Sequence, residues 1–63
     1  MTELQRMYNE MLVNLEKGIN DLEKFEDGNM SAGTRVRKTM QTTKELAQKI
    51  RVTVQEQKNA VVA

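Results

Sequence analysis

Residues 27–29 read Asp27-Gly28-Asn29, and this short stretch separates two long segments that share a helical period. Glycine readily adopts the left-handed conformation that follows the last residue of many helices, so Gly28 is well placed to end the first segment. Asn29 or Ser31 can then accept a hydrogen bond from a free amide and begin the second segment. The stretch therefore predicts a tight turn between two helices.

Apolar residues on both sides of the turn recur at alternating intervals of three and four residues. This spacing places them on one face of a helix. Two helices of about 25 residues that are joined by a few residues must fold back on each other. We therefore predict an all-α, antiparallel two-helix hairpin that forms one domain over residues 1–63, with helices at about 3–27 and 32–58, a turn at 28–31 and a frayed tail.

A single hairpin of this size cannot cover both sides of two wide apolar stripes. Two hairpins packed as a four-helix bundle would bury them, so we expect a homodimer. The residues expected in the core or the dimer interface are Leu4, Met11, Leu15, Leu22, Val36, Met40, Ala47, Ile50 and Val54. Gly18 interrupts the first stripe, where it either permits a close helix crossing or is tolerated at a cost of about 1 kcal/mol.

The composition excludes several classes of function. The chain contains no cysteine and no histidine, so we expect neither a disulfide nor an ordinary zinc site. No apolar run approaches the roughly 20 residues that span a bilayer. We accordingly predict a cytoplasmic protein with no cofactor, no metal site, no catalytic residues, no membrane partner and no small-molecule substrate.

Charge is distributed unevenly along the chain. Residues 1–27 hold three cations and seven acids, net −4, whereas residues 28–63 hold seven cations and two acids, net +5. Four cations of the second half follow one another at intervals of seven residues: Arg37, Lys44, Arg51 and Lys58. We call these four residues the basic ladder, which would extend over roughly 32 Å of helix.

Cations that flank an apolar stripe commonly pair with acids across a helix–helix contact. Within the second helix, however, no acid lies three or four residues from any member of the basic ladder. A regular row of unpaired cations can contact several phosphates of duplex DNA without reading its bases. The ladder therefore favours non-specific binding of double-stranded DNA. The alternative is a helical-hairpin assembly or adaptor module in which the second helix binds an acidic protein partner.

The start of the second helix carries cations where the helix dipole disfavours them, and the end of the first carries acids where these are disfavoured. The cations are Arg35, Arg37 and Lys38, and the acids are Glu23, Glu26 and Asp27. One interpretation is that the two clusters neutralise each other across the turn. The other is that Thr34, the arginines and free backbone amides hold a phosphate. Both can apply if the acids hold the arginines until DNA displaces them.

Residues 28–38 read GNMSAGTRVRK, and residues 45–51 read ELAQKIR. Together they resemble the bacterial linker-histone-like nucleoid proteins of the chlamydial type, in which a similar stretch joins an acidic amphipathic helix to a basic helix. The resemblance covers residues 22–58 and implies a nucleoid-associated protein that binds duplex DNA non-specifically and compacts it. The DNA contacts that it implies are Thr34, Arg35, Arg37, Lys38, Lys44 and Arg51, to which the basic ladder adds Lys58.

Two features of the sequence depart from that family pattern. Met30 stands where many relatives have a lysine, which removes one cation near the turn. The long Lys/Ala-rich tail of the chlamydial members has no counterpart among these residues. Both differences favour an architectural DNA binder that is weaker than the tailed relatives.

Overall fold

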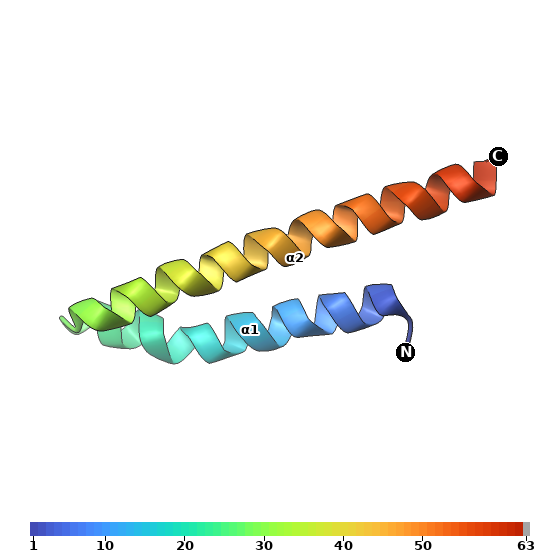
Figure 1. Cartoon of the computed structure of the whole chain (residues 1–63). Helices are drawn as coiled ribbons and strands as arrows, with labels where there is room; N and C mark the ends of the chain where they lie inside the picture. The colour runs from blue at the N-terminus through green and yellow to red at the C-terminus, as the bar shows by residue number, and fades with distance from the viewer. Residues whose placement is uncertain (63) are drawn as a thin grey trace.

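The computed structural model describes residues 1–62, with side chains described through residue 60. Helix α1 spans Glu3–Glu26 and helix α2 spans Met30–Val62. The two helices run in opposite directions from the turn, and α2 continues past the N-terminal end of α1 (Figure 1). The predicted all-α, two-helix hairpin is confirmed.

Side-chain caps begin both helices. Thr2 and Gln5 form a reciprocal capping box at α1: the Thr2 Oγ1 accepts from the Gln5 amide at 3.1 Å, and the Gln5 Oε1 accepts from the Thr2 amide at 3.0 Å. At α2 the Oδ1 of Asn29 accepts from the Ala32 amide at 3.2 Å. Asn29 is therefore the cap, and the Ser31 hydroxyl supports it by donating to the same oxygen at 2.8 Å.

The turn ends α1 as the sequence predicts. Gly28 has a φ of +103°, which lies in the region that favours glycine. The Gly28 amide donates to the Phe25 carbonyl and the Asn29 amide donates to the Lys24 carbonyl, each at 3.0 Å. This paired arrangement is the Schellman motif, which satisfies two of the carbonyls left free at the end of a helix.

Helix α2 is longer than predicted at both ends. It begins at Met30 because Asn29 provides the cap, whereas the prediction placed residues 30 and 31 in the turn. It also continues through Val62, past the predicted end at 58, since residues 59–62 include no glycine or proline. The final turns of α2 extend beyond α1, whose first residues lie level with Thr53 and Glu56.

The contact between the two helices, which we call the hairpin seam, follows a three-and-four spacing but is largely polar at its centre. The buried or partly buried residues along it include Leu4, Met7, Met11, Asn14, Gly18 and Asp21 of α1 and Ala32, Val36, Thr39, Thr43, Leu46, Ala47, Ile50 and Thr53 of α2. The Asn14 Nδ2 donates to the Thr39 carbonyl and to the Thr43 Oγ1, both at 3.1 Å. The Thr43 hydroxyl in turn donates to the Thr39 carbonyl at 2.8 Å. These bonds fix how the two helices are aligned.

At two positions of α1, the residue that faces α2 comes one place before the apolar residue that was predicted for the core or the dimer interface. Leu15 and Leu22 were expected in the core or the dimer interface, and within the hairpin it is Asn14 and Asp21 that face the second helix. Leu15 and Leu22 keep exposed fractions of 37% and 47%. The reason is that small and hydrogen-bonded residues allow close packing at the seam, which leaves the larger apolar side chains outside it.

Gly18 is required for this close packing. A Cβ atom added at Gly18 would lie 3.0 Å from the Cγ2 of Thr39, closer than van der Waals contact allows without movement. We expect Gly18→Ala to leave the free energy of unfolding unchanged or lower it in the native chain. In a Thr39→Ser chain, which lacks the Cγ2 methyl, the same change should raise it by about 1 kcal/mol through helix propensity. Urea unfolding followed by circular dichroism measures both, and equal effects in the two chains would contradict a close crossing.

Candidate nucleic-acid interface

All four members of the basic ladder are exposed on α2. Within the described residues, the ion pairs are those of Arg6 with Glu3 and Glu10 and of Arg35 with Asp21, so none involves the ladder. Each of the first three ladder residues follows a partly buried residue, which turns it about 100° away from the hairpin seam. The ladder is thus a line of free cations along the outer edge of α2.

The acids near the turn do not hold the arginines as predicted. Glu26 and Asp27 form no ion pair within the described part of the chain. Instead the Arg35 Nε donates to the Oδ1 of Asp21 at 2.8 Å, with the Asp21 side chain 21% exposed and that of Arg35 48% exposed. The pair forms because Asp21 is partly buried in the hairpin seam, whereas Glu26 and Asp27 are exposed closer to the turn.

One of the backbone amides expected to hold a phosphate at the start of α2 is already occupied. The Ala32 amide is already bonded by Asn29. Thr34 and Arg35 lie beyond the first turn of α2, where backbone amides bond within the helix. Thr34 is exposed. Contact between DNA and Thr34 stays a prediction.

The predicted DNA contacts fall on two different sides of the hairpin. Residues two positions apart on a helix point about 200° apart, so Arg35 and Arg37 cannot share a surface. Arg37 belongs to the basic ladder and lies beside an apolar hollow with Phe25 and Met30. Arg35 and Lys38 lie instead along a groove between the helices. The sequence-predicted site is therefore two separate basic surfaces.

This second surface, which we call the polar groove, encloses about 340 Å³ between α1 and α2. Its lining residues are Asn14, Lys17, Asp21, Arg35, Lys38, Thr39 and Thr42. Sequence reasoning missed the contribution of Lys17 and the pairing of Asp21 with Arg35, because it treated α1 as an acidic helix. A signal for them does exist: polar or small residues at 14, 18 and 21 mark the hairpin seam, and Lys17 is next to it.

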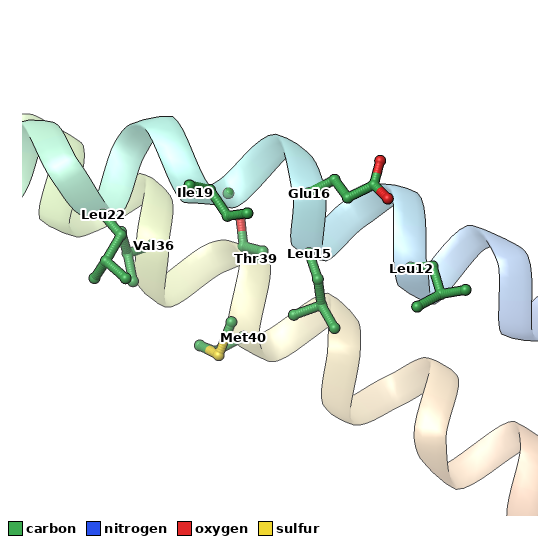
Figure 2. Close-up of a pocket in the computed structure, with 9 residues that line it drawn as sticks. Leu12, Leu15, Glu16, Ile19, Leu22, Val36, Thr39 and Met40 are labelled. Atoms are coloured by element: carbon green, nitrogen blue, oxygen red, sulfur yellow. The ribbon is translucent and has the colours of Figure 1, made fainter.

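The opposite side of the hairpin is apolar. A groove of about 330 Å³ lies between the helices there, with leucine, isoleucine and methionine side chains along it and Glu16 at its margin (Figure 2). We call its large side chains the open apolar face: Leu12, Leu15, Ile19, Leu22, Val36 and Met40. Ile19 and Met40 are 54% and 48% exposed.

The residues predicted for the core or the dimer interface fall into two groups, one partly buried and one exposed. Leu4, Met11, Val36, Ala47 and Ile50 are partly buried by the hairpin itself. The others remain exposed in a single hairpin, and they are Leu15, Leu22, Met40 and Val54. A role for these four in a dimer interface stays a prediction.

Neither described helix combines the length and the apolar character that crossing a membrane requires. Comparison with curated proteins and with solved structures gave no match. The family model described as "Histone H1-like protein Hc1" matches residues 4–60, which include most of both helices and the turn between them. This is a family of histone-like proteins and not of enzymes, and its nucleoid, DNA-binding character agrees with the two basic surfaces. The chain belongs to the histone H1-like Hc1 family.

Proposed function

We propose that the chain binds double-stranded DNA without regard to base sequence, through phosphate contacts of the basic ladder. It would act in the cytoplasm as a nucleoid-associated, architectural protein that takes part in DNA compaction. The observation that carries this proposal is the row of Arg37, Lys44, Arg51 and Lys58, exposed on α2 and free of ion pairs within the described residues. Free cations displace condensed counterions from DNA, and this release supplies most of a non-specific affinity.

The chemistry of the ladder suits phosphate rather than bases. Lys and Arg side chains on the edge of a helix reach the DNA backbone, whose contacts carry no sequence information. Base stacking needs aromatic side chains, and this chain has only Tyr8 and Phe25, both on α1. A duplex lying along α2 would therefore contact positively charged side chains, but no surface that reads its bases.

We also infer that two hairpins associate. The described molecule measures 53 × 19 × 11 Å, so it is a single layer of helices with nothing covering either broad side. Its accessible surface is 5215 Å², against about 4,200 Å² for a compact monomer of 7.3 kDa. The excess of roughly 1,000 Å² is similar to the share of one partner in a stable protein–protein interface.

The open apolar face is the surface that a second copy would cover. Among residues 1–60, only Met7 and Ala32 are buried by the hairpin, while Leu12, Ile19 and Met40 are each about half exposed. Two such faces packed together would complete a four-helix bundle. Because the basic ladder runs beside this face and not within it, the ladders of both copies would stay at the edge of the bundle, accessible to DNA.

A fluorescence titration of labelled duplexes tests the proposed function. Two duplexes of unrelated sequence should bind with affinities that agree within about threefold, since only phosphates are contacted. An acidic polypeptide of equal charge serves as the competitor. A strong preference for the acidic polypeptide, with no binding of either duplex, would instead support the adaptor module.

A further inference from the structure

We propose that the polar groove is a second phosphate-binding site, which holds a backbone phosphate of a DNA segment other than the one on the basic ladder. This inference rests on the proposed DNA binding but concerns different residues and another side of the molecule. Three cations surround the groove, Lys17 from α1 and Arg35 and Lys38 from α2. The groove also contains one carboxylate, that of Asp21, so its net charge is +2.

The groove offers hydrogen-bond donors as well as charge. The Asp21 carboxylate accepts from the Arg35 Nε at 2.8 Å, which leaves the other four N–H groups of that guanidinium available. Arginine presents these donors in a planar fork that matches the oxygens of a phosphate. In the described part of the chain, the hydroxyls of Thr39 and Thr42 donate no hydrogen bond within the protein. A phosphate in the groove could thus accept hydrogen bonds from the Arg35 guanidinium, from the two lysine ammonium groups and from the two threonine hydroxyls.

The ion pair with Asp21 fixes the position of Arg35. Asp21 is only 21% exposed and lies in the hairpin seam, so its carboxylate is a fixed anchor for an otherwise long and mobile side chain. A guanidinium held in place loses less conformational entropy when it binds an anion. The carboxylate also repels a phosphate, so Asp21 sets the affinity of the groove by two opposing effects.

The polar groove faces away from both other surfaces. Lys17 is two residues from Leu15, and Lys38 is two residues from Met40, so each pair points about 200° apart around its helix. Leu15 and Met40 belong to the open apolar face. A second copy on that face would therefore leave the polar groove uncovered. A duplex bound along the ladder would likewise lie out of reach of the groove.

Three variants of the full chain, each with two cations replaced by glutamine, have the same net charge. Comparing them separates phosphate binding in the groove from an effect of net charge on DNA affinity. The groove variant is Lys17→Gln with Lys38→Gln, and the ladder variant is Lys44→Gln with Arg51→Gln. The matched control is Lys24→Gln with Lys49→Gln, two cations that line neither surface. Affinity for a random-sequence duplex is measured by fluorescence anisotropy between 0.05 and about 0.3 M salt. Circular dichroism checks that each variant keeps its helices.

Because a duplex bound along the ladder lies out of reach of the groove, the groove variant should keep that first binding event. It should bind a second duplex about eightfold more weakly at 0.1 M salt, with a salt slope smaller by about 0.9, because the one phosphate contact of the groove is lost. The control should stay within about threefold of the native chain, since exposed charges outside contact range are screened. A groove variant that matches the native chain or merely equals the control would overturn the groove as a site. Failure of the native chain to bind DNA at all would instead overturn the proposed function itself.

Asp21→Asn provides a second variant whose expected effect has the opposite sign. Asparagine keeps the Oδ1 that accepts from the Arg35 Nε, so the anchor is retained while the negative charge beside a bound phosphate is removed. The affinity for the second duplex should therefore rise about three- to tenfold at 0.1 M salt. If Asp21 served only to hold the hairpin together, the change would weaken binding or leave it unaltered. Either of those two results would contradict a phosphate in the polar groove.

Discussion

Reversing two members of the basic ladder, Lys44→Glu with Arg51→Glu, is expected to weaken binding of random-sequence duplex DNA at least about 60-fold at 0.1 M salt. Each lost phosphate contact removes about 0.9 from the salt slope, and two contacts therefore account for roughly this factor before any repulsion is added. Both residues are exposed and free of ion pairs within the described chain, so the hairpin should keep its helices. A gel-shift or anisotropy titration measures the change.

The control for this pair is Lys24→Glu with Lys49→Glu, which changes the net charge by the same amount away from the ladder. It should weaken binding by only a small factor, because the phosphates do not reach these positions. If the two double variants lose affinity equally, binding depends on net charge alone and the ladder is not the contact surface. Thermal unfolding of both variants separates loss of contact from loss of fold.

Placing a charge on the open apolar face should prevent the proposed association of two hairpins. Ile19 is 54% exposed in a single hairpin, so Ile19→Glu costs that hairpin little. In a four-helix bundle it would remove two buried isoleucines and bury two carboxylates. We expect the dimer dissociation constant to rise about 10²- to 10³-fold, which corresponds to roughly 3–4 kcal/mol. Sedimentation equilibrium over a range of concentrations measures it.

Val13→Glu is the matched control for that experiment. Val13 is also exposed on α1, at 39%, but it lies outside the open apolar face. This variant should associate as the native chain does. A native chain that sediments as a 7.3 kDa monomer at every concentration would contradict the inferred dimer. An equal loss of association in the Ile19→Glu and Val13→Glu variants would contradict the open apolar face as the dimer interface.

The elements of the fold were predictable because their signals are local. Gly28 and Asn29 mark the turn by backbone conformation and by capping chemistry, and both act within a few residues of sequence. What sequence reasoning could not decide is which face of α1 packs against α2. A period of apolar residues marks surfaces to be buried, but it does not distinguish burial within one chain from burial between two. Leu15 and Leu22, predicted for the core or the dimer interface, are thus left exposed by the hairpin, and their place in a dimer stays a prediction.

The hairpin seam itself depends on partners that are distant in sequence. Asn14 is suited to this position only because Thr39 and Thr43 lie opposite it, and nothing near Asn14 in the sequence indicates that. The same holds for Asp21 and Arg35, which are 14 residues apart. The absence of acids at helical spacing correctly predicted a basic ladder free of ion pairs within α2. The polar groove could not be predicted, since it exists only where two helices meet.

The most direct test of the central claim, non-specific DNA binding through phosphates, is the salt dependence of affinity. The titration of a random-sequence duplex is repeated at several salt concentrations, and log K is plotted against log salt. If a dimer engages about eight phosphates, the slope should be roughly −7, and it should be the same for a duplex of unrelated sequence. A flat plot would contradict the claim.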